Sequence, residues 1–150
     1  MAKFIYRMQN ILDIKLKMED QAKASFAEAN KELLIQEEKL EGLIRRREEY
    51  GLEGQRLRLE KLNVIKLKDN SRALQVMKDM IKAQEMVVSI ARDKVELARR
   101  KLQVAMQERK TQEKLKENAF EEFKHELNSE ESKEVDELVS YRFGSGSGDN

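Results

Sequence analysis

The chain has no cysteine, no proline and no tryptophan, and aromatic residues supply only 5% of its 150 positions. Without cysteine, neither a disulfide framework nor a thiolate metal site can form, and the composition is compatible with a reducing cytosol. Without proline, nothing forces a helix to stop before the glycines. Because 39% of the residues are charged, we exclude a thick globular core and favour long helices that are buried along one stripe.

Long apolar runs are also missing. No stretch approaches the roughly 20 apolar residues that a membrane-spanning helix needs. The first seven residues lack the continuous apolar segment of a secretory signal. The 30 basic and 29 acidic residues nearly cancel, which argues against a general nucleic-acid binder. We therefore expect a cytoplasmic protein that reaches a membrane only through a partner, with no direct insertion.

Two segments instead carry apolar residues at alternating steps of three and four, which keeps one stripe facing a partner helix. The first seam contains Met8, Ile11, Met18, Ala22, Phe26, Ala29, Leu33, Leu40, Leu43 and Tyr50. The second seam contains Leu74, Met77, Ile81, Val88, Ala91, Val95, Ala98, Leu102, Ala105, Ala119 and Phe123. The four-residue steps between Met18, Ala22 and Phe26 indicate a local stutter. The pattern predicts an all-α fold, a long two-stranded antiparallel coiled-coil hairpin with an irregular tip.

Helix signals divide the chain further. We expect one hairpin domain over residues 1–143 and a flexible Gly/Ser tail over 144–150. Within the domain, a first helix is predicted at about 4–50 and an irregular tip, beginning at glycines 51 and 54, at about 51–69. A second helix is predicted at about 70–127, capped by Asn70 or Ser71. A short C-terminal helix is predicted at about 130–141, after a break at Asn128 and Ser129.

Polar residues interrupt both seams. On the first seam these are Lys15, Gln36 and Arg47, and on the second Gln84, Arg109, Gln112 and Lys116. Single polar residues on a seam usually fix the register of the two helices. The run from Arg109 to Lys116 instead predicts loose packing near the open end of the hairpin, or a cover supplied by another protein.

Residues that would support catalysis do not converge in this pattern. A two-helix ribbon has no pocket, and no phosphate-binding loop or nucleophile with a base is present, so we expect neither enzymatic activity nor a cofactor. The single histidine, His125, lies among Glu121, Glu122 and Glu126. A metal site and a solvated acidic face are both compatible with that cluster, and the solvated face is favoured.

The two ends of the chain carry a family resemblance. The opening reads Phe4-x-Tyr6-Arg7-x-Gln9-x-Ile11-Leu12-Asp13-x-Lys15, followed by Glu19-Asp20-Gln21-Ala22. The C-terminal half reads Glu113-Lys114-Leu115-x-x-x-Ala119-Phe120-x-x-Phe123, then Glu130-x-x-x-Glu134-x-Asp136-Glu137. In order, spacing and length, residues 3 to about 143 resemble the bacterial flagellar export protein FliJ family.

The resemblance implies a role that the spacing alone does not indicate. Proteins of this family are antiparallel coiled coils similar to the stalk subunit of rotary ATPases, and they act in flagellar type III protein export, in flagellum biogenesis and hence in motility and chemotaxis. The implied partners are the hexameric export ATPase, the export-gate membrane protein and export chaperones. The implied location is the cytoplasmic face of the inner membrane.

The resemblance also suggests contact residues. Those aligned with the gate-facing part of the family are Leu43, Tyr50, Met77 and Gln84, with Ala73 and Met80 nearby. Simple seam packing explains Leu43, Tyr50 and Met77 equally well. At the ATPase-facing end, position in the chain points to Phe4, Arg7, Phe120, Phe123 and Arg142. Lys39 and Arg46 depart from the family's amide and aromatic residues.

Two other classes of protein share the hairpin. A stalk subunit of a rotary F- or V-type ATPase has more sequence outside the coiled coil than this chain has. A homo-oligomeric coiled-coil scaffold requires seams that pair between chains, and the break after Gly51 argues against an uninterrupted rod. Since fold alone does not separate these classes, the end motifs favour the export protein.

Overall fold

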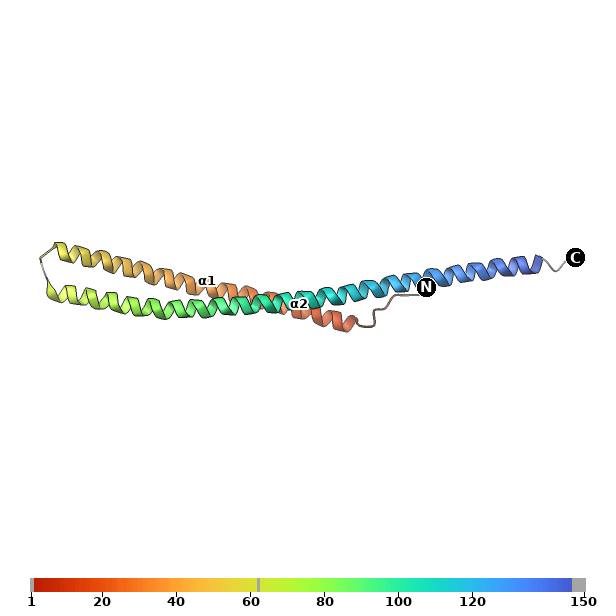
Figure 1. The fold of residues 1–150 in the computed structure, drawn as a ribbon, viewed down its shortest axis with the longest axis horizontal. Helices are drawn as coiled ribbons and strands as arrows, with labels where there is room; N and C mark the ends of the chain where they lie inside the picture. The colour runs from red at the N-terminus through yellow and green to blue at the C-terminus, as the bar shows by residue number, and fades with distance from the viewer. Residues whose placement is uncertain (1, 62, 147–150) are drawn as a thin grey trace. The chain divides into compact units, whose positions relative to one another are not determined.

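The computed structural model describes residues 2–61 and 63–146 and forms two long helices (Figure 1). Helix α1 spans Gln9–Leu59 and helix α2 spans Val64–Gly146. Within these described residues there is no strand. The prediction of an all-α helical hairpin is confirmed.

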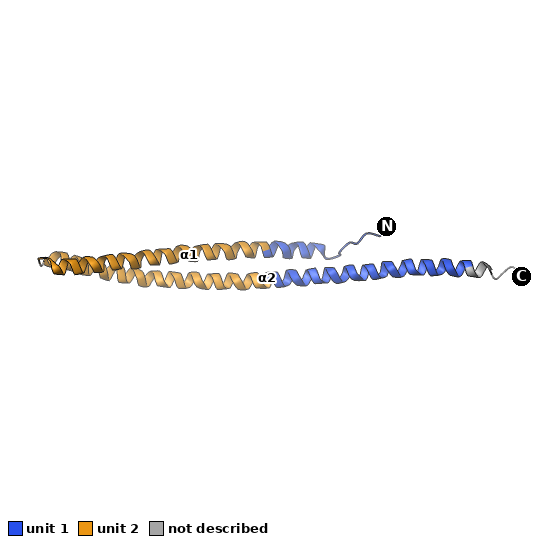
Figure 2. Ribbon diagram, turned by 90° about the horizontal axis from the view of Figure 1, so that it is seen from above, with its two compact units in different colours: residues 1–19, 105–150 blue, residues 20–104 orange. Residues whose placement is uncertain are grey.

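The chain divides into two compact units (Figure 2). The terminal unit comprises residues 1–19 and 105–150, so it contains the N-terminal segment, the first turns of α1 and the second part of α2. The loop unit comprises residues 20–104, which hold the rest of α1, the connection and the first part of α2. The expectation that residues 1–143 form a single domain stays a prediction.

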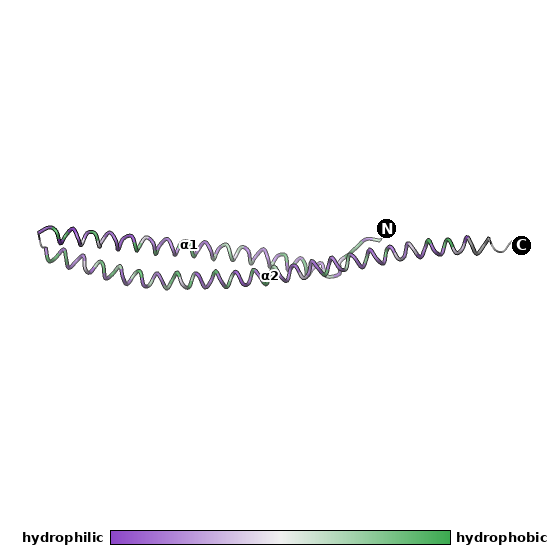
Figure 3. Tube along the Cα trace, turned by 45° about the horizontal axis from the view of Figure 1, so that its top comes forward, coloured by the Kyte–Doolittle hydropathy of each residue, from purple (hydrophilic) through white to green (hydrophobic). Residues whose placement is uncertain are grey.

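In the loop unit, the predicted second seam forms the buried face of α2. Met77, Ile81, Val88 and Ala91 are buried, and Val88 is only 3% exposed. Half-buried residues of α1 recur at the same heptad steps, and apolar residues return turn by turn along both helices (Figure 3). Burial of this narrow stripe accounts for two helices of such polar composition.

The first part of the α1 seam lies one residue later than predicted. Three residues predicted for it are exposed: Met8, Ile11 and Met18. Leu12 and Glu19 are buried in their place, at 4% and 5% exposure. Regular heptad steps from Leu12 reach Ala22, so the predicted stutter is wrong. The prediction followed apolar residues, whereas charged side chains occupy the seam here and are paired across it.

The boundaries of α1 differ from those predicted. The helix begins at Gln9 rather than near residue 4, and residues 2–6 have no regular secondary structure. It also continues through Gly51 and Gly54 to Leu59. The connection between the helices is therefore residues 60–63, much shorter than the predicted tip of residues 51–69. Each glycine costs a helix about 1 kcal/mol relative to alanine. Burial of Leu57 on the seam offsets this cost.

The cap of α2 is Asn63 rather than the predicted Asn70 or Ser71. The backbone amides of Ile65 and Lys66 donate to Asn63 Oδ1 at 3.1 and 3.3 Å, which is the hydrogen bonding of an N-cap. Asn70 lies inside α2, where its side-chain Nδ2 donates to the Tyr50 carbonyl at 2.8 Å. This asparagine therefore ties α2 to α1 within the loop unit.

The predicted break before a short C-terminal helix is also wrong. Helix α2 runs without interruption through Asn128 and Ser129 to Gly146. Neither residue stops a helix by itself, and the surrounding glutamates and lysines are good helix formers. Of the predicted flexible tail, residues 144–146 lie in the last turn of α2, and residues 147–150 lie outside the described residues.

Candidate functional site

Three aromatic rings form a cluster in the terminal unit. The Phe4 ring lies edge-on to Phe120, with centroids 5.1 Å apart, and its centroid is 5.4 Å from that of Phe123. The ammonium of Lys124 lies 4.9 Å from the Phe120 centroid, within cation–π range. The structure thus brings together three of the five residues predicted to face the ATPase. Arg7 and Arg142 are exposed and lie outside this cluster.

Polar pairs replace apolar layers along the seam of the terminal unit. Three of these pairs are Tyr6 Oη with Gln112 Oε1 at 3.4 Å, Lys116 Nζ with Gln9 Oε1 at 2.7 Å, and Lys15 Nζ with Glu108 Oε2 at 3.0 Å. The sequence predicted loose packing at Arg109, Gln112 and Lys116. Instead, each of these side chains finds a partner on the opposite segment.

The fourth pair, Arg109 with Glu19, is the most buried. The Arg109 guanidinium donates to the Glu19 carboxylate and, at 2.8 Å, to Glu113 on its own helix. The hydrogen bond to Glu19 raises the pKa of Arg109, and Glu113 adds to the rise, while burial opposes it. An arginine is charged at every physiological pH, so this pair fixes a buried glutamate opposite a permanent cation.

The last turns of α2 offer a second apolar surface in the terminal unit. Every side chain from residue 128 to residue 142 is exposed. Val135, Leu138 and Val139 share one helical face, because they are spaced at three and four residues. This stretch is therefore an amphipathic helix end whose apolar face is exposed to solvent.

In the loop unit, α2 carries a second apolar stripe beside its buried seam. Its large members precede seam positions by one residue and are 40–54% exposed: Val76, Met80, Val87, Ile90, Leu97 and Val104. Ala83 continues the heptad spacing, and Lys94 and Lys101 interrupt it. We did not predict this stripe, although the same sequence spacing would have revealed it as a register offset by one residue. Such an ordered exposed stripe is typical of an interaction surface.

The predicted gate-facing residues lie on the seam rather than on this stripe. Met77 is 5% exposed, and Leu43 and Tyr50 are half-buried. Gln84 donates through Nε2 to the backbone oxygen of Gln36 at 3.0 Å and to its Oε1 at 2.8 Å. Met80 alone, of the residues named near them, belongs to the exposed stripe. The gate contacts stay a prediction.

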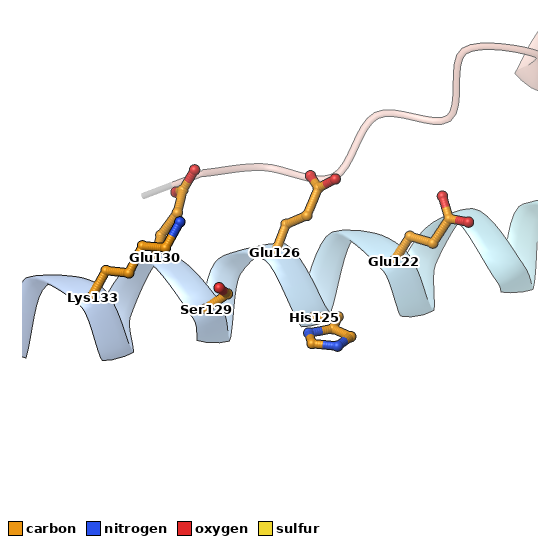
Figure 4. Close-up of a pocket in the computed structure, with 6 residues that line it drawn as sticks. All are labelled: Glu122, His125, Glu126, Ser129, Glu130 and Lys133. Carbon is orange, nitrogen blue, oxygen red and sulfur yellow. The ribbon is translucent and has the colours of Figure 1, made fainter.

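The acidic cluster around His125 does not converge on a metal. A shallow surface depression there is lined by Glu122, His125, Glu126, Ser129, Glu130 and Lys133. The glutamates point to one side of α2, and the imidazole of His125 points away from them (Figure 4). Among the described residues, no group of three or more acidic or histidine side chains is arranged to hold a metal ion.

Comparison of the sequence with models of protein families identifies the family of this chain. Within residues 2–61 and 63–146, neither helix has an apolar stretch that would cross a bilayer. Comparison with curated proteins and with solved structures gives no match. A sequence model of one family, described as flagellar FliJ protein, matches residues 4–148, nearly the whole chain. The chain therefore belongs to the flagellar FliJ protein family, and its role is related to flagellar protein export.

Proposed function

We propose that this protein is a non-catalytic coupling stalk of the flagellar type III export apparatus. Its terminal unit docks into the ring of the export ATPase and promotes assembly and activity of that ring. Its loop unit contacts the export-gate protein, and the stalk also handles export chaperones. The observation that carries the proposal is the family match over residues 4–148. The protein would work in the cytoplasm and reach the inner membrane through these partners.

The exposed end of α2 supports the ATPase contact. A helix whose apolar face is unpaired gains stability by burying that face in a partner. Val135, Leu138 and Val139 form such a face. Acidic residues at 130, 131, 134, 136 and 137 surround it and favour a partner collar with basic residues at its rim.

The exposed stripe of α2 supports the gate contact. A partner reaches Val87 and Ile90 without separating the helices, whereas it reaches Met77 only by opening the seam. Lys94 and Lys101 add positive charge to the same stripe, which favours an amphipathic helix with acidic flanks as the contacting segment of the gate. We therefore propose that the gate-facing surface is this exposed stripe, one residue away from the predicted seam positions.

Neither of the two alternatives receives comparable support. A stalk of a rotary F- or V-type ATPase and a homo-oligomeric scaffold share the helical hairpin, but fold does not determine function. The family match instead favours flagellar export.

The ATPase contact is tested by steady-state ATP hydrolysis by the export ATPase of the same organism, with and without this protein, at low ionic strength. We expect stimulation together with a shift toward hexamers. The Leu138→Glu variant should lose several-fold in stimulation because it places a charge on the docking face. The matched control Leu97→Glu, on the loop unit, should stimulate normally. If a folded wild-type hairpin neither binds nor stimulates, the ATPase contact is refuted.

The gate contact is tested separately, by binding to the cytoplasmic portion of the export-gate protein. Ile90→Glu should weaken this binding by an order of magnitude, because a buried interface disfavours an unpaired carboxylate. Lys82→Glu changes an exposed residue off the stripe and serves as the control. Equal binding by both variants would show that the stripe is not the gate-facing surface.

A further inference from the structure

The end of the loop unit, where α1 is connected to α2, carries apolar side chains that do not pack on the other helix (Figure 1). We define the hairpin end as residues 56–61 and 63–68. Its seam residues are Leu57, which is buried, and Leu67, which is half-buried. Leu59, Val64 and Ile65 are 89%, 60% and 73% exposed. The hairpin itself therefore gains little stability from the apolar character of these three residues.

Helix formation does not explain these residues either. Val64 and Ile65 are the first two residues of α2, and β-branched residues are weaker helix formers than alanine or lysine. The cap of this helix is made by Asn63 with backbone amides, so any side chain at position 64 or 65 would allow it. Leu59 is the last residue of α1. Three apolar side chains from the ends of two helices thus project into solvent around one turn.

Basic side chains surround these apolar residues. The hairpin end has five basic residues and one acidic residue, Glu60, although the basic and acidic residues of the whole chain nearly cancel. The five basic residues are all exposed: Arg56, Arg58, Lys61, Lys66 and Lys68. Of these five, only Arg56 has an ion-pair partner among the described residues, Glu53 at 2.7 Å. The other four cations can therefore pair with an anionic partner.

Exposed apolar side chains surrounded by cations match the surface of an anionic bilayer. On such a surface, apolar side chains enter the boundary between headgroups and acyl chains, while lysine and arginine reach the lipid phosphates. Lys61 and Lys66, together with Glu60, line one shallow surface depression that is open to a headgroup. We infer that the hairpin end binds the surface of a membrane that contains anionic phospholipid, without crossing it. This differs from the expectation that the chain reaches a membrane only through a partner.

An acidic protein segment is the competing occupant. A protein partner buries apolar residues against a surface of matching shape, and the exposed stripe of α2 offers such a face along one helix. At the hairpin end, Leu59 and Ile65 instead project from different helices on the two sides of a turn. A fluid bilayer adapts to projecting side chains, which favours lipid. The inference is independent of the proposed function, because lipid binding requires no export protein.

The charge contribution is tested by cosedimentation of the full chain with phosphatidylcholine vesicles, with and without phosphatidylglycerol. We expect binding only to the anionic vesicles, and weaker binding at high salt. Changing both Lys61→Gln and Lys66→Gln should weaken it about twentyfold, since each cation near an anionic surface contributes about fivefold. The matched control, Lys78→Gln with Lys82→Gln, removes two exposed cations of α2 outside the hairpin end and should bind normally. Equal losses in both double variants would overturn the inference.

The apolar contribution is tested with the same vesicles. Leu59→Ser and Ile65→Ser should each weaken binding about tenfold, while circular dichroism shows intact helices. Met86→Ser is the control, since Met86 is 69% exposed on α2 outside the hairpin end. The chain has no tryptophan, so Leu59→Trp introduces a single indole, whose emission should shift to shorter wavelength on anionic vesicles.

Three results would overturn the inference. One is the absence of binding to anionic vesicles, and another is binding that leaves the emission of the Leu59→Trp variant unchanged. The third is loss of binding to the export-gate protein in the Lys61→Gln, Lys66→Gln double variant without any vesicle binding by the wild type, which would make the hairpin end a protein contact. Stimulation of the export ATPase is measured separately, so failure of lipid binding leaves the proposed function standing.

Discussion

At the scale of single residues, charged side chains set the register of the terminal unit. Glu19 is buried opposite Arg109, and Lys15 reaches Glu108 across the same seam. The raised pKa of Arg109 means that its contribution to stability is complete below its unfolded pKa and would be lost only as the pH rises through the folded value. Both values lie far above neutrality, so Arg109 confers no pH dependence on the terminal unit in the physiological range.

This register is tested by two neighbouring apolar residues. Leu12 is 4% exposed and Ile11 is 41% exposed. Leu12→Ala should cost about 2 kcal/mol of unfolding free energy, at the low end for leucine because the seam is narrow. Ile11→Ala should cost about 0.5 kcal/mol or less. Urea unfolding followed by circular dichroism measures both. A larger loss for Ile11→Ala would restore the predicted register.

The two glycines of α1 are expected to respond differently to alanine. A Cβ at Gly51 meets nothing within 4 Å, so Gly51→Ala should stabilise the helix by up to about 1 kcal/mol. A Cβ at Gly54 would lie 2.5 Å from Asn70 Oδ1. Gly54→Ala must therefore push the Asn70 side chain from the Tyr50 carbonyl, and the lost hydrogen bond of about 1 kcal/mol should cancel the gain. Equal rises in Tm for the two variants would show that the hydrogen bond from Asn70 to the Tyr50 carbonyl does not stabilise the loop unit.

At the scale of elements, the helices were predictable and their ends were not. Every residue that the heptad spacing predicted for the α2 seam is buried or half-buried, because apolar residues occupy nearly every seam position in the loop unit. Leu67, which is half-buried before the predicted start of this helix, was missed. The ends of α1 depend on tertiary contacts. Packing of Phe4 on α2 keeps residues 2–6 outside the helix. Burial of Leu57 stabilises the part of α1 that follows Gly51 and Gly54. Local propensity does not contain this information.

The cap of α2 provides a test at this scale. Asn63 accepts two backbone amides, whereas Asn128 lies inside α2 and is exposed. Asn63→Ala should cost about 1 kcal/mol because the first-turn amides lose their acceptor. Asn128→Ala should be neutral or slightly stabilising, since alanine is the better helix former. A destabilised Asn128→Ala variant would instead support the predicted break at Asn128 and Ser129.

At the scale of the whole molecule, the two units have seams of different chemistry. Apolar residues dominate the loop unit, whereas four polar pairs occupy the terminal unit. Part-buried polar pairs contribute less net stability than the apolar layers that they replace. Amides of residues 9–19 should therefore exchange with deuterium faster than those of residues 81–98, and more so in high salt. Equal protection in both segments would refute this difference.

The sequence was enough to predict the family of the protein, but it was not enough to predict which residues are exposed for contact with partners. End motifs predicted the family, and the family model confirms it. Phe4, Phe120 and Phe123 were predicted to lie near one another, and they do, but their mutual contact was not foreseen because Phe4 was placed in a helix. The gate-facing residues were taken from the family resemblance, and Leu43, Tyr50, Met77 and Gln84 all lie on the seam, where each is buried or half-buried. A change of register by one residue moves the predicted contacts from the buried seam of α2 to its exposed stripe. The spacing of apolar residues alone fits both registers.

The central proposal is that the terminal unit binds the export ATPase and the loop unit binds the export gate. The chain has no native cysteine, so single introduced thiols can test this proposal directly. Val139→Cys and Ile90→Cys place single thiols on the exposed faces of the terminal and loop units. Each variant is labelled with a photoactivatable cross-linker and mixed with the export ATPase. The account predicts ATPase adducts from Val139→Cys and none from Ile90→Cys. Adducts from Ile90→Cys alone would contradict it.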